Sequence, residues 1–255
     1  MNRLTFILLL WLAPCLAYAA HPLQTDDTGT QHTGNWQLEL NTDRTHSEDR
    51  IAETSSRTRE VNATLTYGAA ATLDVYTNLP WNRQDDDDGA GGRSLAAGHG
   101  DQAVGLKWRA WRQDEISLGA KAELTLPTGD DTRGLGAGRA NLGLTGLLQY
   151  TREHWMLLAN VTLNSNRSAN PADDHRAVIG GLSAAALYAL TGQWRVLMDA
   201  GSMQGGTGSA AAARYFLLGV IYSPQGTLDF DLGLRRDVQG DVRATKFGGG
   251  FTLRF

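Results

Sequence analysis

The chain ends on the stretch KFGGGFTLRF, which runs from Lys246 to Phe255 and alternates in polarity up to its last residue. Phe247, Phe251 and Leu253 share the odd positions with the terminal phenylalanine, and polar residues stand between them. A soluble domain usually ends in a loose polar tail. Here the last side chain continues the apolar face of a strand. The stretch therefore predicts a terminal strand that forms part of a larger surface.

Composition limits the class of protein. The 255 residues are enough for one large all-β domain or two small ones. Lysine and arginine number 23 against 27 aspartate and glutamate residues, so no basic surplus exists to neutralise phosphates. This balance excludes a nucleic-acid partner.

Residues 1–20 have the pattern of a secretory signal peptide. Arg3 precedes the apolar run 6–13, and the stretch 17–19 provides a cleavage site between small residues. A buried first helix and lipidation at Cys15 are the less favoured alternatives. Because Cys15 is the only cysteine, the mature chain is expected to be exported without a disulfide. Residues 21–33 are then expected to form a periplasmic N-terminal segment.

The remaining residues, 34–255, alternate with period two over about twelve segments of roughly ten residues, the length of a tilted membrane-spanning strand. A soluble sandwich could show the same alternation, but the links decide between the two. Tight links alternate with long polar ones at 45–57, 82–100, 127–138, 164–175 and 201–211. This predicts an all-β fold, a transmembrane antiparallel up-and-down β-barrel of about twelve strands.

Aromatic residues support the same prediction. If the N-terminus is periplasmic, nine of them fall near the periplasmic ends of the strands and in phase with the apolar face. These predicted girdle residues are Trp36, Tyr67, Trp108, Tyr150, Trp155, Tyr188, Trp194, Tyr222 and Phe255. Such a band marks one bilayer interface, and Phe255 completes it on the strand that closes the barrel.

Several stretches resemble a known family. HPLQTDDTGT (21–30), GNWQLEL (34–40), GDQAVGLKWR (100–109), LTLPTGD (124–130) and the terminal phenylalanine are similar to the outer-membrane barrels named for the meta pathway of phenol degradation. The resemblance covers nearly the whole mature chain. It implies an outer-membrane barrel that passes aromatic or other hydrophobic compounds, and it supplies no catalytic residue.

No motif predicts a catalytic, cofactor or metal site. The acidic run Asp85 to Asp88 has the ligands that Ca²⁺ prefers, but a solvated mobile loop is the favoured interpretation. Gly134, Gly136 and Gly138 lack the βαβ context of a nucleotide site, and are expected to let a loop fold over the mouth. The six histidines lack metal-site spacing. His154 has no serine nearby, which argues against a lipid hydrolase.

The positions that face the lumen fall into two sectors. The charged sector contains Glu39, Lys107, Arg109, Lys121, Glu123, Asp229, Asp231 and Arg235, with Glu60, Asp74, Lys246 and Arg254 beside them. The apolar wall contains Leu147, Met156, Leu158, Ile179, Leu187 and Leu197, continued by Leu217 and Ile221. The charges are expected to pair across the lumen. Because exposed apolar surface is costly in water, the N-terminal segment, the loop 127–138 or a hydrophobic solute should cover the wall.

The sequence therefore predicts a channel or transporter in the bacterial outer membrane for small compounds, aromatic or hydrophobic ones among them. Its expected partners are outer-membrane lipids, the barrel assembly machinery and a small-molecule solute. A lipid-modifying enzyme and a structural barrel without transport are the alternatives. The sequence leaves the solute and the oligomeric state open.

Overall fold

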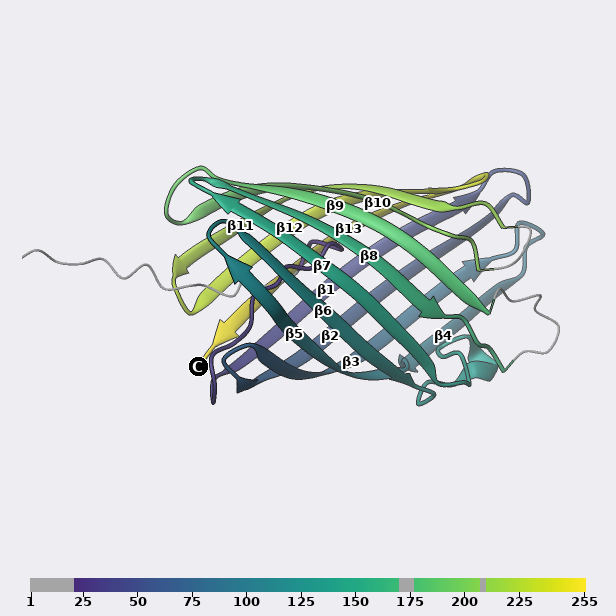
Figure 1. The fold of residues 1–255 in the computed structure, drawn as a ribbon. Helices are drawn as coiled ribbons and strands as arrows, with labels where there is room; N and C mark the ends of the chain where they lie inside the picture. Colours follow the sequence, from purple (N-terminus) through teal and green to yellow (C-terminus); the bar gives the residue numbers. More distant parts are fainter. Residues whose placement is uncertain (1–20, 170–176, 207–209) are drawn as a thin grey trace, which may run out of the picture.

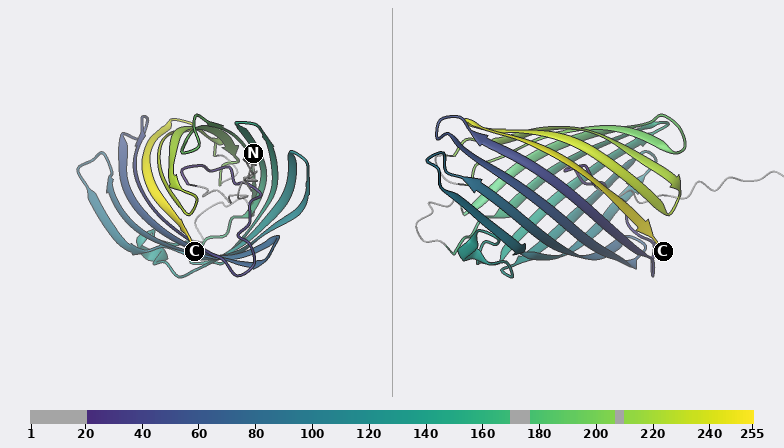
Figure 2. Two further views of the ribbon diagram at one scale, coloured as in Figure 1. Left: turned by 90° about the vertical axis from the view of Figure 1, so that its left-hand side faces the viewer. Right: turned by 180° about the vertical axis from the view of Figure 1, so that it is seen from behind.

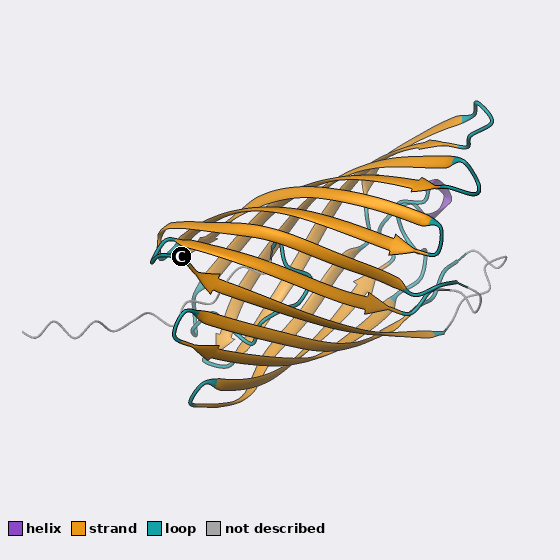
Figure 3. Cartoon of the chain, turned by 90° about the horizontal axis from the view of Figure 1, so that it is seen from above, coloured by secondary structure: helices purple, strands orange, loops and turns teal. Residues whose placement is uncertain are grey.

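The computed structural model describes residues 21–169, 177–206 and 210–255, so the predicted signal peptide lies outside the described residues. Almost every described element is a strand, and the single short helix is of the 3₁₀ type (Figures 1 and 3). The strands are β1 (Trp36–Asp49), β2 (Thr54–Ala70), β3 (Leu73–Asp87), β4 (Arg93–His99), β5 (Gln102–Gln113), β6 (Ile116–Leu126), β7 (Asn141–Arg152), β8 (Trp155–Ser165), β9 (Val178–Ala189), β10 (Trp194–Met203), β11 (Ala213–Gln225), β12 (Leu228–Gln239) and β13 (Val242–Arg254), and the helix is η1 (Asp131–Arg133).

The strands form one closed antiparallel sheet. Apart from β4 and β5, each strand pairs with its neighbours in the chain, and β1 pairs with both β2 and β13. β4 and β5 both pair with β3 along successive stretches, so they are two parts of one strand in a barrel of 12. Their break at Gly100 faces Pro80, whose missing N–H interrupts the ladder. The predicted all-β up-and-down barrel is confirmed.

The ends of the chain meet at the seam of the barrel. The Trp36 N–H donates to the Phe255 carbonyl at 2.8 Å, and the Phe255 N–H donates back to the Trp36 carbonyl at 3.0 Å. The pairing of β1 with β13 then continues from Gln37 to Asp49. The aromatic C-terminus is therefore the last rung of the ladder that closes the sheet.

Two hairpins extend further than the sequence predicts. The polar links expected at 45–57 and 82–100 are mostly strand, because β1–β2 and β3–β4 stay paired up to turns at 50–53 and 88–92. Backbone hydrogen bonds do not depend on side-chain polarity, so the ladders continue where the apolar alternation stops. The run Asp85 to Asp88, expected in a mobile loop, lies on β3 and its turn.

The outside of the barrel carries an apolar belt. Leu79, Leu106, Leu144, Val161 and Phe230 are among many large apolar side chains that are exposed there. The nine predicted girdle residues lie at the strand ends nearest the C-terminus, and three pairs of their rings touch, at centroid distances of 4.5–4.7 Å. We call this end the girdle end and the opposite end the loop end. No described helix is long and apolar enough to cross a membrane; this barrel would cross by its strands.

A charge on the belt should be expelled from lipid. Val161 is 58% exposed on the outer face of β8, and its neighbour Thr162 points into the lumen. Replacing Val161 or Leu144 by arginine should make folding into lipid vesicles less favourable by about 2–4 kcal/mol. Thr162→Arg is the control and should fold like the wild type. If Val161→Arg folds equally well, the assignment of faces fails.

The seam makes a second prediction. Deleting Phe255 removes both hydrogen bonds to Trp36 and one aromatic ring of the girdle. We expect clearly less folded barrel in the membrane fraction, measured by the heat-dependent shift in electrophoretic mobility. Phe255→Tyr keeps the backbone bonds and the ring and should restore the level. An unchanged level in the deletion variant would show that closure does not need the last residue.

Candidate functional site in the barrel lumen

Residues 21–33, which the sequence analysis gave both as a periplasmic segment and as one possible cover of the apolar wall, lie inside the barrel. The purple N-terminal trace runs within the ring of strands when the barrel is viewed along its axis (Figure 2, left). Thr25, Thr28 and Thr30 are buried between this segment and the inner face of the barrel. We call residues 21–33 the plug. A barrel of this strand number is too wide for its own side chains to fill, so the inward fold gives the lumen side chains partners.

A buried carboxylate on β10 holds the first part of the plug. Asp199 accepts hydrogen bonds from the backbone N–H groups of Gln24 and Thr25 at 2.6 and 2.9 Å. The Thr25 and Tyr215 hydroxyl groups donate to the same carboxylate at 2.7 and 2.8 Å. Four donors on one buried carboxylate replace its hydration. Asp199 was not among the residues predicted from the sequence, where its signal is a lone acidic residue in an apolar strand.

The middle of the plug forms ion pairs with the lysines of the charged sector. The Lys107 ammonium lies 2.8 Å from Asp26 and 2.7 Å from Asp27, and Lys121 lies 3.3 Å from Asp26. Burial alone would raise the pKa of Asp26, but the two lysines outweigh it and hold that pKa well below its usual value. Asp26 therefore stays ionised, and its ion pairs together with that of Asp27 fix the plug against β5 and β6.

The start of the plug carries a second charged contact. The His21 ring hydrogen-bonds Asp231 on β12 and lies 3.7 Å from Asp43 on β1. Lys246 also reaches Asp43, at 3.4 Å. Burial would lower the pKa of His21, but the hydrogen bonds and charges of Asp231 and Asp43 raise it to about 9. The imidazole is therefore a cation at neutral pH and joins the plug to two strands beside the seam.

Leu23 of the plug covers the apolar wall. It forms one buried cluster with side chains from β8 to β11: Met156, Leu158, Ala185, Leu187, Leu197, Leu217 and Ile221. Leu147 is buried outside this cluster, and Ile179 is half-buried opposite Asn164 near the loop end. The loop 127–138 is held elsewhere, since Asp101 accepts bonds from Gly129 and Ala137 at 2.9 and 2.7 Å.

Two glycines make room for the plug. A Cβ atom added at Gly233 would lie 2.6 Å from Pro22, and one at Gly219 would lie 2.9 Å from it. Contacts this short require something to shift, so a side chain at either position would push the plug off the wall. This explains why β11 and β12 carry glycine at neighbouring lumen-facing positions.

The remaining charges of the sector pair locally or with polar groups. Arg254 and Arg195 lie 2.9 and 3.4 Å from Asp229, whereas Arg235 pairs with Asp237 on its own strand. Other charges of the sector hydrogen-bond polar groups. The Tyr76 hydroxyl donates to Glu123 at 2.7 Å, the Gln37 amide to Glu39 at 2.5 Å, Arg109 to the Ala71 carbonyl at 2.9 Å, and the Gln31 N–H of the plug to Asp74 at 2.9 Å. The expected pairing across the lumen is thus largely replaced by pairing with the plug and with adjacent residues.

Two chambers remain beside the plug. A cavity of about 430 Å³ opens toward the loop end and is lined by Asn160, Thr162, Ser183 and Tyr215 among others. A smaller one of about 180 Å³ lies among β1, β2, β3 and the plug. Asp26, Lys121 and Glu123 line both. The plug therefore separates a polar vestibule from the wall that it covers.

The comparisons agree with this architecture. A family model described as "Putative MetA-pathway of phenol degradation" matches residues 25–255. The chain belongs to this family. The predicted resemblance is thereby confirmed, and the match includes most of the plug. A search of curated protein sequences found no match.

Solved structures share the fold of this phenol-degradation family barrel. The COG4313 outer membrane channel from Pseudomonas putida F1 superposes with a TM-score of 0.73 at 17% identity, covering 90% of this chain and 98% of that one. The CymD monoaromatic hydrocarbon channel gives 0.52 at 10% identity, covering 88% of each chain. The NalP translocator domain from Neisseria meningitidis gives 0.57 at 9%, covering 89% and 91%. At these identities the likeness is one of fold.

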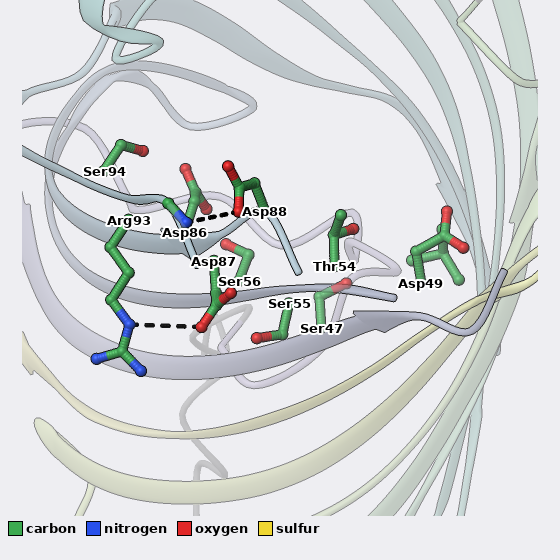
Figure 4. Close-up of a pocket in the computed structure, with 12 residues that line it drawn as sticks. Ser47, Asp49, Thr54, Ser55, Ser56, Asp86, Asp87, Asp88, Arg93 and Ser94 are labelled. Carbon is green, nitrogen blue, oxygen red and sulfur yellow. Dashed lines mark hydrogen bonds and ion pairs between the residues drawn. The ribbon is translucent and has the colours of Figure 1, made fainter. Parts of the chain in front are cut away.

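A separate polar pocket of about 630 Å³ lies at the loop end of this family barrel (Figure 4). The tips of β1–β2 and β3–β4 line it with serines and with Asp49 and Asp86 to Asp88. Arg93 lies 3.4 Å from Asp87, and Asp88 accepts the Gly92 N–H at 2.8 Å. Among the described residues, no group of three or more acidic, histidine or cysteine side chains could hold a metal ion.

The His21 contact predicts how the barrel responds to pH. Because the pKa of His21 is raised from 6.5 to about 9, its charge stabilises the plugged state fully below pH 6.5, and this contribution is lost as the pH rises through about 9. Conductance across planar bilayers should therefore increase between about pH 6 and about pH 10.

The variant His21→Gln tests that assignment. It should conduct at neutral pH as the wild type does at alkaline pH, and its response to pH should be flat. His46→Gln is the control, since His46 is exposed and pairs with Glu48 outside the lumen. A wild-type pH profile in His21→Gln would assign the titration to another group.

Proposed function

We propose that this barrel is an outer-membrane channel for small hydrophobic compounds, monoaromatic ones among them. The observation that carries the proposal is the apolar wall beneath a plug that hydrogen bonds, ion pairs and the packing of Leu23 hold in place. In a passive pore for ions or sugars, a wall of leucine and isoleucine would oppose the solute. An apolar solute that leaves water and contacts the same wall is stabilised by about 25 cal/mol per Å² of apolar surface buried.

The family and the fold support this proposal. The family model is named for phenol degradation, and barrels of similar fold are described as an outer membrane channel and a monoaromatic hydrocarbon channel. In the outer membrane the girdle end faces the periplasm and the loop end faces outward. The girdle end carries the short turns, the start of β1 and the end of β13. The predicted signal peptide of residues 1–20 fits export to that membrane.

Transport would begin in the vestibule and require the plug to move. A solute that enters from the loop end meets the chamber of about 430 Å³ lined by hydroxyl and amide groups. Leu158 and Leu187 beyond it are each 3% exposed, so the solute reaches them only if Leu23 withdraws. The ion pairs of Asp26 and Asp27 with Lys107 are the contacts that must open, and Asp26 lines both chambers.

A lipid-modifying enzyme is the second candidate and has less support. His154, the histidine on the strand-end turn before β8, lies 5.9 Å from the Tyr188 ring by centroids. It sits at the girdle end, away from the plug and the chambers. A phospholipid hydrolysis assay on the purified barrel would reveal this activity.

Selective uptake tests the proposed channel. Cells with and without the protein are compared for uptake of aromatic, aliphatic and small polar compounds. Leu158→Asp places a charge in the wall beneath Leu23 and should reduce uptake of apolar aromatic compounds at least several-fold, because burying a carboxylate next to an apolar solute is unfavourable. Small polar compounds should pass at the wild-type rate or faster.

Ile179 serves as the matched control. The sequence placed it in the wall, but the structure leaves it outside the buried cluster, so Ile179→Asp should change uptake of apolar compounds little. Folding of both variants is checked by heat-dependent mobility. If a well-folded Leu158→Asp barrel changes the uptake of apolar and polar compounds by the same factor relative to the wild type, or changes neither, then the wall only packs the plug.

A further inference from the structure

The outer face of the barrel carries a row of arginines immediately above the apolar belt. Arg44 on β1 is the register partner of Arg59 on β2, and Arg59 is the partner of Arg83 on β3. Each side chain alternates in phase with the outward apolar residues of its strand, and each is exposed. Three guanidinium groups therefore lie side by side on neighbouring strands. We call Arg44, Arg59 and Arg83 the arginine row.

Such a row repels itself unless an anion lies over it. Directly opposite Cβ atoms in an antiparallel pair are about 5 Å apart, and like charges there are destabilising. Among the described residues, no carboxylate forms an ion pair with any member of the row. The positive field is uncompensated on the protein side.

The charged side chains around the arginine row do not neutralise it. In the next row toward the loop end, Arg57 stands between His46 and Asp85. His46 pairs with Glu48, and Asp85 has the Arg57 side chain opposite it in the register, so each of these two acidic groups has a basic neighbour of its own. On β12, Arg236 donates to Thr245 and adds a further positive charge on the other side of β1. The surface around the row therefore carries no acidic surplus.

The surface below the row is apolar. Val61 and Trp81, one step toward the girdle end, are 43% and 39% exposed, and Leu79 follows below them at 46%. A ligand that matches both surfaces has anionic groups at the height of the arginines and acyl chains beneath them. A soluble anion would satisfy only the upper half.

We propose that the arginine row binds the phosphate groups of a phosphorylated glycolipid in the outer leaflet, with its acyl chains lying over Val61 and Trp81. The orientation of this site rests on the proposed function, which places the loop end outside the cell. Arginine suits this role because its planar fork binds phosphate oxygens in pairs and its long stem can lie along apolar surface.

The site is one-sided. At the loop end of β6 to β10, the large exposed side chains that the structure describes are apolar, as at Leu142, Leu163 and Val178. The glycolipid would therefore be held against β1, β2 and β3, which also carry the tall hairpins. Lipid on the opposite side of the barrel would exchange freely.

Native mass spectrometry of the purified full-length barrel tests the site. The probes are a diphosphorylated lipid A, the same glycolipid without phosphates, and phosphatidylethanolamine. The wild type should retain the diphosphorylated glycolipid selectively. The triple variant Arg44→Gln, Arg59→Gln, Arg83→Gln should bind it on the order of a hundredfold more weakly, from about fivefold for each arginine.

A matched control removes the same charge elsewhere. The triple variant Arg133→Gln, Arg139→Gln, Arg152→Gln changes three exposed arginines away from the row and should bind like the wild type. Heat-dependent mobility verifies that both variants are folded. Unchanged binding by the folded row variant, or equal retention of the phosphate-free glycolipid, would overturn the proposal.

Orientation is tested separately from transport. The only cysteine lies within the predicted signal peptide, so Ala52→Cys, in the β1–β2 turn, gives a unique label site. An impermeant maleimide should label it on intact cells. Labelling only after lysis would overturn the outer-leaflet site. Loss of solute uptake with retained lipid binding would instead count against the proposed function alone.

Discussion

The constraint on which the structure depends is that a backbone crossing lipid must satisfy every hydrogen bond within itself. A sheet meets this condition only when it closes. Closure here is the pairing of β1 with β13, which ends in the reciprocal bonds between Trp36 and Phe255. Once the sheet is closed, strict alternation sends one set of side chains to lipid and the other to the lumen. The belt and the lumen follow from that single division.

Closure creates the problem that the plug solves. Twelve strands enclose more space than their own lumen side chains fill, and those side chains include both isolated charges and a leucine-rich wall. One segment meets both needs, because Leu23 packs on the wall while Asp26, Asp27 and His21 match charges on several strands. The plug thus makes polar contacts through residues on both sides of Leu23, which makes the apolar contact. Such contacts exchange with water more readily than a fully apolar core does, which is compatible with a removable plug.

Period-two alternation together with the alternation of tight and long links was sufficient to predict the closed barrel, because alternation shows which face of a strand meets lipid and the links show that the strands run up and down. The apolar wall predicted that something covers it and named the N-terminal segment as one candidate, but the contacts of that segment could not be predicted in the same way. The segment HPLQTDDTGTQHT has no period, and its partners Asp199, Asp231 and Lys107 are scattered over strands that only closure brings together. The full length of the hairpins β1–β2 and β3–β4 was not predicted for a different reason. Beyond the apolar belt both faces of these strands are polar, so the alternation ends while the ladder of hydrogen bonds continues. Asp85 was accordingly expected in a loop and lies on β3.

The plug also bears on how β8 to β10 keep their register. These strands are apolar on both faces for much of their length, so a slip by one residue would exchange one apolar surface for another at small cost. Asp199 breaks that degeneracy. In the observed register its carboxylate accepts four hydrogen bonds, three of them from Gln24 and Thr25 of the plug. A one-residue slip would turn the same carboxylate into lipid, where nothing replaces those donors. The residue that anchors the plug thus also specifies the least distinctive part of the wall, which ties the filling of the lumen to the correctness of the sheet around it.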